Sequence, residues 1–199
     1  MGRHLRRLEW TGAGLVLAVP LALLAVVGLG RWQESARETA CMENARRLTL
    51  AALCYVCGND ERLPPVDWCD RLMTPDPHAG MHLPGRPAPP PSAKPVLLVN
   101  APALFRCPSA PGERCGFAYN RLAANVALSD FADCGATVLL IEADGGWNQT
   151  AGPGFRPPVR HPDGVVVAWA DGHVRVVPRS RLAGLNWDPK RPATPQTTR

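Results

Sequence analysis

Four side chains near the C-terminal end of the sequence are of types that bind metals or transfer protons. His161 and Asp163 lie close together, and Asp171 and His173 follow them. Imidazole nitrogens and carboxylate oxygens are common metal ligands, so convergence of these side chains would create a metal or catalytic site. Asp171-Gly172 is also favoured in turns for its backbone angles. Because spacing alone does not show convergence, we expect structural roles for this segment, with a metal site as the alternative.

Glu142 and Asp144 form a second oxygen-rich segment, followed by two glycines. Hard oxygen ligands suit Ca²⁺, but this ion takes roughly six to eight oxygens, and the segment offers two carboxylates. We therefore expect no bound cofactor, and we retain calcium as a less favoured alternative.

Cysteines are unusually frequent for a chain of 199 residues, and all seven follow the apolar N-terminal segment. They are Cys41, Cys54, Cys57, Cys69, Cys107, Cys115 and Cys134. This usage predicts an oxidising compartment with disulfides. The two-residue gap between Cys54 and Cys57 is typical of redox or zinc pairs, but a helix C-terminus does not lower a thiol pKa. Pairing of Cys107 with Cys115 and pairing of Cys41 with Cys107 both remain open.

Residues 11–30 carry no charge, and as a helix they would match the hydrocarbon thickness of a bilayer. Arg3, Arg6 and Arg7 precede this run, which predicts that residues 1–10 are cytoplasmic. We therefore expect a single-pass protein of the inner (cytoplasmic) membrane with an extracytoplasmic, periplasmic domain. A cleaved secretory signal is the alternative, although the run is long for one and lacks a small-residue cleavage site.

The composition excludes several classes of function. The formal net charge of +5 lies at the two ends of the chain, while the middle is slightly acidic, so we expect no nucleic-acid partner. No phosphate-binding loop, dinucleotide fingerprint or nucleophile elbow occurs, and we predict a non-enzymatic protein. The 22 prolines and 18 glycines predict many loops and a modest core.

Residues 31–57 place small and apolar side chains three or four positions apart, which predicts a helix that lies on a folded domain. Gly58 follows this stripe as a stop signal. Prolines are so dense in residues 64–95 that we expect an extended surface loop there. The domain as a whole is expected to span residues 31–178.

Residues 96–177 form the predicted sheet region. Runs at 96–99 and 137–141 are apolar and rich in residues that favour strands. The run at 164–177 contains Asp171-Gly172, which predicts a hairpin with a two-residue type I′ turn. The polar residues 179–199 are expected to form a flexible tail.

Three blocks of sequence occur in order through this part of the chain. Residues 36–65 hold the predicted helix end and its exit, and residues 105–109 read Phe-Arg-Cys-Pro-Ser, with Tyr119-Asn120 following. In the last block, nine residues separate His161 from Asp171-Gly172. Together they resemble the large prepilin-like family that is named for its His-x9-Asp-Gly motif.

The resemblance implies an α+β, pilin-like fold. In such a fold the first half of a long N-terminal helix lies in the membrane, and its second half packs on a small antiparallel sheet. The resemblance also implies a structural or assembly role in a type II secretion or type IV pilus-like system. The partners would then be similar subunits or proteins of the apparatus, and His161, Asp171 and Gly172 would be motif residues.

The start of the chain departs from the family pattern. The family usually has Gly-Phe-Thr-Leu-x-Glu, whereas residues 9–13 here read Glu-Trp-Thr-Gly-Ala. In the family, burial of this glutamate in a bilayer is costly unless it meets the N-terminal amine of a neighbouring subunit, so the residue is linked to assembly. The present chain lacks it. This departure favours the first of two alternatives that stay open. One is an anchored envelope protein that does not assemble, and the other is a metal-binding or metal-dependent envelope protein that uses the region of His161 and Asp171.

Overall fold

The computed structural model describes residues 2–73, 75–76, 96–97, 101–110 and 112–192, and for residues 2–25, 75–76 and 96–97 it describes the backbone alone. The chain divides into two compact units, Met1–Arg37 and Glu38–Arg199. Helix α1, Gly2–Val56, begins in the first unit and ends in the second.

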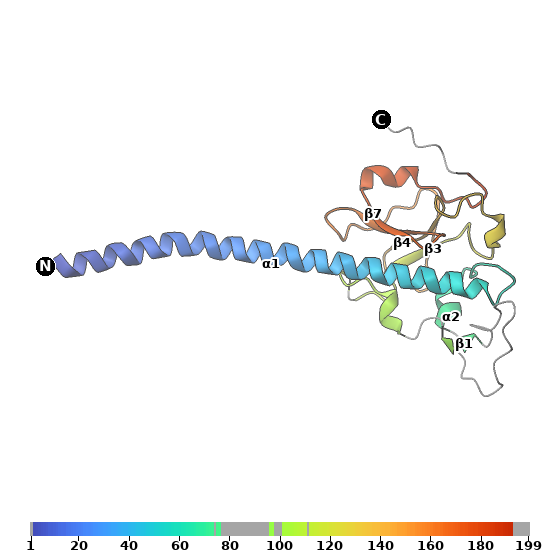
Figure 1. The fold of residues 1–199 in the computed structure, drawn as a ribbon, viewed down its shortest axis with the longest axis horizontal. Helices are drawn as coiled ribbons and strands as arrows, with labels where there is room; N and C mark the ends of the chain where they lie inside the picture. The colour runs from blue at the N-terminus through green and yellow to red at the C-terminus, as the bar shows by residue number, and fades with distance from the viewer. Residues whose placement is uncertain (1, 74, 77–95, 98–100, 111, 193–199) are drawn as a thin grey trace. The chain divides into compact units, whose positions relative to one another are not determined.

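The first unit consists of the N-terminal part of α1 (Figure 1). Its described side chains include four exposed large apolar residues, Val26, Val27, Leu29 and Trp32. In the described part of the chain, no helix is long and apolar enough to cross a membrane. The side chains of residues 11–25, which make up most of the predicted span of 11–30, lie outside the described part.

The second unit is built on a five-stranded sheet with the strand order β5-β3-β4-β6-β7. The strands are β3 (Phe117–Asn120), β4 (Val138–Glu142), β5 (Thr150–Ala151), β6 (Val165–Trp169) and β7 (Val174–Val177). Strands β3, β4, β6 and β7 pair antiparallel in this order, but β5 pairs parallel with β3. The predicted α+β class is confirmed, whereas the antiparallel sheet is wrong, because the loop after β4 returns the chain beside β3 in the same direction.

One face of the sheet packs against the second half of α1. Alternation along β6 places Val166 and Ala168 on this face and Val165 and Val167 on the other. The helix contributes a buried stripe at helical spacing, which comprises Cys41, Ala45, Leu48, Ala52 and Val56. This part of the fold agrees with the predicted helix on a sheet.

The opposite face of the sheet is covered by the C-terminal segment, for which the sequence predicts a flexible tail. Residues Arg179–Gly184 form the 3-10 helix η3, and Trp187 is 6% exposed. The backbone carbonyl of Asn186 accepts a hydrogen bond from the N–H of Val138 at 2.9 Å. The prediction is wrong as far as the described residues extend, because Trp187, Leu182 and Leu185 complete an apolar layer on this face. Residues 193–199 lie outside the described part.

The proline-rich region also contains structure that its composition conceals. Helix α2, Trp68–Met73, buries Trp68, Cys69 and Leu72. Strands β1 (Pro75–Asp76) and β2 (Val96–Leu97) form a separate antiparallel pair. The predicted extended loop is therefore wrong at its N-terminal end, where the indole of Trp68 stacks on Tyr119 with ring centroids 5.8 Å apart. Residues 77–95 lie outside the described part.

The predicted hairpin is present as β6 and β7, but its turn differs from the predicted type. Trp169 N–H donates to the carbonyl of His173, and Gly172 N–H donates to the carbonyl of Trp169, so three residues form the loop. Gly172 has a φ of +92°, and Asp171 is not among the residues with positive φ. A type I′ turn needs positive φ at both central residues, whereas a three-residue loop needs it only at its last residue.

Gly164, at the entrance to β6, provides a sharp test of this hairpin. Its φ is +150°, and a Cβ there would lie 2.3 Å from the carbonyl oxygen of Val177. We expect Gly164→Ala to lower the free energy of unfolding by at least about 2 kcal/mol, from backbone strain and steric overlap. Chemical denaturation followed by tryptophan fluorescence measures this loss. Gly184→Ala is the control, because a Cβ at Gly184 would have no atom within 4 Å; equal losses in both variants would contradict the assignment.

Candidate functional site

Four buried side chains from distant parts of the sequence meet beneath α1. They are Cys41, Cys107, Glu142 and His161, here called the buried cluster. Each is at most 1% exposed, and one ligand atom from each lies within 4.8 Å of the others. Among the described residues, this is the group of His, Cys, Asp and Glu side chains that could hold a metal ion.

One carboxylate oxygen is at the centre of the buried cluster. Glu142 Oε1 lies 3.0 Å from His161 Nε2 and accepts hydrogen bonds from the thiols of Cys41 at 3.2 Å and Cys107 at 3.4 Å. His161 Nε2 also lies 3.7 Å from Cys107 Sγ. These four contacts bring two sulfurs, one nitrogen and one oxygen within 4.8 Å of one another.

Local structure explains why each group reaches this point. Cys41 belongs to the buried stripe of α1, and Glu142 follows Leu140 on the helix-facing side of β4. Cys107 passes close to Gly116, where a Cβ would lie 2.7 Å from the Cys107 nitrogen. His161 forms an isolated β-bridge with Gly164 at the entrance to β6.

Glu142 is oriented from its far side. Its Oε2 accepts a hydrogen bond of 2.8 Å from the backbone N–H of Val166, so Oε1 is directed at the other members of the cluster. Burial raises the pKa of this carboxyl, but the bonds from His161 and Val166 outweigh burial and hold the pKa below its usual value. Glu142 is therefore an anion inside the domain.

His161 and the cysteines are shifted by the same contacts. Burial lowers the pKa of His161, but contacts with Cys107 and with the carboxylate of Glu142 raise it to about 10. The pKa of Cys41 is raised by its hydrogen bond to Cys107 and by burial. The hydrogen bond from Cys41 in turn lowers the pKa of Cys107. The buried cluster thus pairs the imidazole of His161 with the carboxylate of Glu142 and contains two sulfurs that share a hydrogen bond.

Arg160 is a neighbouring buried charge that sequence reasoning missed. Its side chain is 6% exposed and forms an ion pair with Glu113. It also donates to the carbonyl of Ala143 at 2.5 Å and to that of Gly116 at 3.3 Å. These bonds fix the segment before His161 to both neighbouring loops. The signal was available, because an arginine directly precedes the motif histidine in the sequence.

The other predicted site residues lie elsewhere. Asp163 is exposed, and Asp144, with a side chain that is 73% exposed, lies 3.5 Å from Arg160 rather than facing the same centre as Glu142. Asp171 is 42% exposed and pairs with His173 at 2.6 Å. The structure therefore assigns His161 and Asp171 to different environments, one in the interior and one at the surface.

The Asp171-Gly172 turn nevertheless packs against α1, the helix that also contributes Cys41 to the buried cluster. A Cβ at Gly172 would lie 3.6 Å from the side chains of both Leu50 and Leu53 of α1. A surface pocket of about 580 Å³ lies between this turn and the helix, lined in part by Met42, Arg46 and His173. Both ends of the motif segment thus meet α1, one beside Cys41 and the other about three turns later.

All seven cysteines are free thiols in the structure. The proximity of Cys41 and Cys107 fits one of the two pairings left open by the sequence. Cys115 instead forms a side-chain hydrogen bond with Cys69, so the Cys107–Cys115 alternative is not favoured. Cys54 and Cys57 are exposed at the end of α1, and Cys134 is half-buried.

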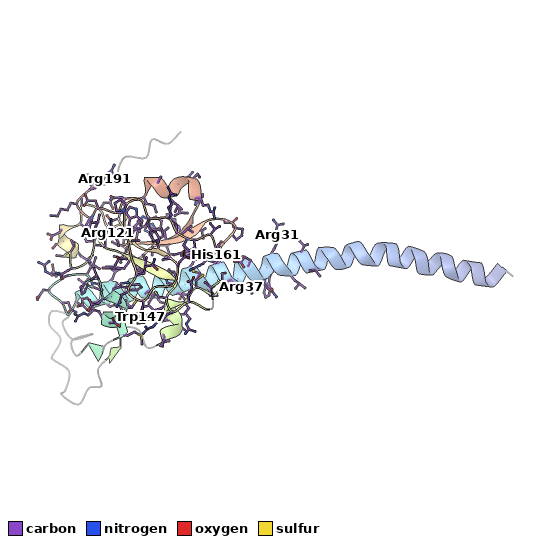
Figure 2. All side chains as sticks on the ribbon, turned by 180° about the vertical axis from the view of Figure 1, so that it is seen from behind. Arg31, Arg37, Arg121, Trp147, His161 and Arg191 are labelled. Atoms are coloured by element: carbon purple, nitrogen blue, oxygen red, sulfur yellow. The ribbon has the colours of Figure 1, made fainter. Side chains whose placement is uncertain are left out.

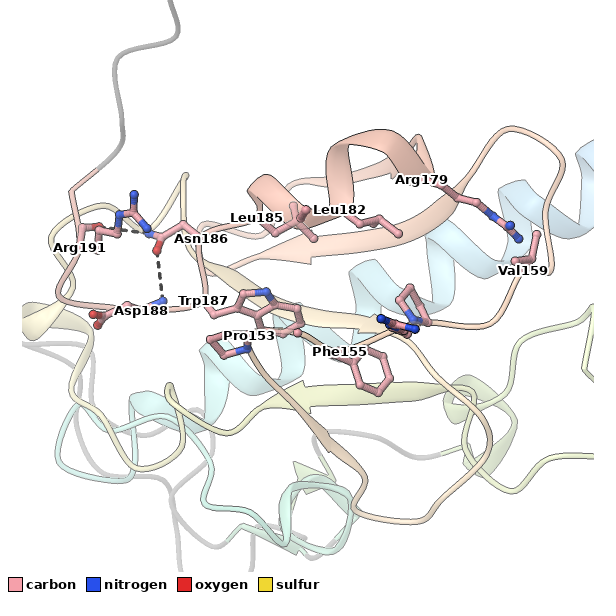
Figure 3. A pocket seen from close by; sticks show the side chains of 14 residues that line it. Pro153, Phe155, Val159, Arg179, Leu182, Leu185, Asn186, Trp187, Asp188 and Arg191 are labelled. Atoms are coloured by element: carbon pink, nitrogen blue, oxygen red, sulfur yellow. Dashed lines mark hydrogen bonds between the residues drawn. The ribbon is translucent and has the colours of Figure 1, made fainter.

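A second pocket, of about 530 Å³, lies beside the C-terminal segment (Figure 3). Phe155, Leu182 and Trp187 contribute apolar surface to it, and Arg179 and Arg191 are among its charged residues. No member of the buried cluster lines this pocket. His161 lies inside the globular part of the molecule (Figure 2), which separates the buried cluster from this surface feature.

Removal of the imidazole tests the interior role of His161. We expect His161→Ala to lower the free energy of unfolding at pH 7 by about 3–5 kcal/mol, because the carboxylate of Glu142 would remain buried without its partner. Denaturant titration measures the loss. His173→Ala, in which a partly exposed ion pair and a stacking contact with Trp169 are lost, should cost at most about 2 kcal/mol. A larger loss in the control than in His161→Ala would reverse this assignment.

Comparison with protein-family models, curated proteins and solved structures finds no match to the chain. The function is therefore argued from the sequence and from the geometry of the helix, the hairpin and the buried cluster.

Proposed function

We propose that the protein is a membrane-anchored, pseudopilin-like structural component of a type II secretion or type IV pilus-like system. In this proposal it lies in the inner membrane, with Glu38–Arg199 outside the cytoplasm, and it catalyses no reaction. The single observation that carries the proposal is that the motif segment, residues 161–172, contacts α1 at both of its ends. The segment reaches the helix at the buried cluster and again where Gly172 meets Leu50 and Leu53.

This arrangement supports a mechanical role for the motif. The charges of Glu142 and His161 have no exposed atoms, so they are poorly placed to meet a substrate. They instead connect the end of β4, the entrance to β6 and the stripe of α1. A domain that is fixed in this way to a helix would transmit force or position along that helix rather than turn over a ligand.

The N-terminal part of α1 supports an anchoring and packing role. Val26, Val27, Leu29 and Trp32 are 59–71% exposed in the single chain, which is unfavourable in water. A bilayer or the helices of other subunits would cover such side chains. The uncharged residues 11–30 overlap this part of the helix.

Membrane anchoring is tested by placing charge in the proposed span. We expect Leu21→Arg combined with Leu24→Arg to release the protein from membranes under alkaline carbonate extraction. Each arginine near the bilayer centre costs about 2.5–3.5 kcal/mol. Val159→Arg, at an exposed position of the globular unit, is the control and should leave the protein in the membrane fraction. Retention of the double variant in that fraction would argue against a span at residues 11–30.

Assembly is tested by photo-crosslinking in native membranes. With a photoreactive amino acid at Val27, we expect crosslinks to further copies of the chain or to components of a secretion or pilus apparatus. The same amino acid at the exposed Asp163 should give few of these products. Recovery of monomer alone from Val27 would favour a stand-alone anchored protein. Determination of the mature N-terminus in the same preparation shows whether the chain is cleaved.

A further inference from the structure

The buried cluster contains more chemistry than a structural ion pair requires. Two thiols, one imidazole and one carboxylate are enclosed together, and each is at most 1% exposed. A buried ion pair rarely repays the cost of removing both charges from water. One carboxylate oxygen, one imidazole nitrogen and two sulfurs within 4.8 Å of one another are a set of ligand atoms that a metal ion could bind.

We propose that the buried cluster is a structural zinc site, in which one Zn²⁺ ion binds one atom from each of the four side chains. This proposal is independent of the pilus-like function, because the same site would stabilise the domain in any anchored envelope protein. The ion would link α1 to three segments of the globular unit.

The atom separations fit this metal. Zinc bonds of about 2.0–2.3 Å to oxygen, nitrogen and sulfur in tetrahedral geometry place neighbouring ligand atoms about 3.3–3.8 Å apart. Four of the six separations in the buried cluster are 3.0 Å between oxygen and nitrogen, 3.2 and 3.4 Å between oxygen and sulfur, and 3.7 Å between nitrogen and the sulfur of Cys107, and the other two are at most 4.8 Å. These four separations need adjustments of a few tenths of an ångström, and those from Cys41 Sγ to Cys107 Sγ and to His161 Nε2 need at most about 1.5 Å, to complete the tetrahedron. Sulfur and imidazole ligands together favour zinc over calcium or magnesium.

Supporting hydrogen bonds already orient the ligands. The backbone N–H of Val166 holds Glu142 Oε2, which leaves Oε1 for the ion. Asn44, one turn after Cys41, donates to the carbonyl of Arg106 at 2.9 Å and so fixes the residue before Cys107 against α1. Such outer contacts are a common feature of metal sites because they fix ligand orientation.

The second cysteine pair provides an internal comparison. Cys69 and Cys115 share a hydrogen bond, and among the described residues the other hydrogen bonds of the two sulfurs are with the backbone. The backbone N–H of Asn148 donates to Cys69 Sγ at 3.4 Å, and the Cys115 thiol donates to the carbonyl of Phe117 at 3.3 Å. That environment suits a disulfide. The environment of Cys41 and Cys107 instead brings a carboxylate and an imidazole against the sulfurs, which a disulfide would not need.

The charges of the proposed site can be accounted for. Cys41 and Cys107 would bind as thiolates, Glu142 as a carboxylate and His161 as a neutral imidazole, so zinc entry would release protons. The complete site would carry one net negative charge. Four protein ligands leave no open position for a substrate, which is the arrangement of a structural rather than a catalytic zinc site. Because no ligand is exposed, the ion would enter while the domain folds.

The test uses the full chain, extracted in detergent under reducing conditions from cells supplied with zinc. We expect one zinc per chain by elemental mass spectrometry. In the chain produced in cells supplied with Co²⁺ in place of zinc, we expect a thiolate-to-cobalt charge-transfer band and the intense visible absorption of tetrahedral cobalt. The wild-type spectrum needs no variant, so the result does not depend on the folding of a mutant. Glu142→Gln and Cys107→Ser should each bind zinc at least about tenfold more weakly.

Cys54→Ser is the matched control, since Cys54 is exposed at the end of α1. It should retain full zinc content and an unchanged cobalt spectrum. Three results would overturn the proposal. They are reduced wild-type protein without metal, zinc retained at full affinity by both cluster variants, and a Cys41–Cys107 disulfide in the chain isolated from its native membrane.

Discussion

The contact between Glu142 and His161 is the interaction on which the arrangement of the second unit depends. The two side chains lie 3.0 Å apart with no exposed atom, and they join the end of β4 to the segment before β6. The thiols of Cys41 and Cys107 meet the same carboxylate oxygen. A charge placed here must be satisfied, because an unpaired buried carboxylate costs several kcal/mol. The helix, the sheet and the loop before β3 are therefore tied to one point.

A sheet that is covered on both faces explains much of the remaining sequence. Every residue of β4 and β6 is buried, because α1 covers one face and the segment around Trp187 covers the other. Apolar runs rather than alternating ones are expected of such strands. Arg160 adds a second internal anchor beside His161, with the ion pair to Glu113 and the carbonyl of Ala143 as partners.

The sequence predicted those elements whose signals are local. The stripe of α1, the run of β4 and the β6–β7 hairpin follow from spacing and residue type, and the stop at Gly58 follows from helix capping. The parallel strand β5 was not predictable, because two residues carry no periodic signal. The buried cluster was missed as a unit. Its members come from four separated segments, and Glu142 was grouped with Asp144 as a possible calcium segment.

The covering of the sheet by the last segment also has a consequence for how the protein folds. Cys41 and Glu142 are 101 residues apart, and Trp187 comes still later in the chain. Few of the contacts that stabilise α1 on the sheet are local, so loop closure must precede most of the energetic gain. During synthesis, the apolar stripe of α1 would stay exposed to water until the strands of the sheet, which extend to Val177, had left the ribosome. Binding of a chaperone to this stripe, or early insertion of the N-terminal helix into the membrane, would therefore limit aggregation most in that interval.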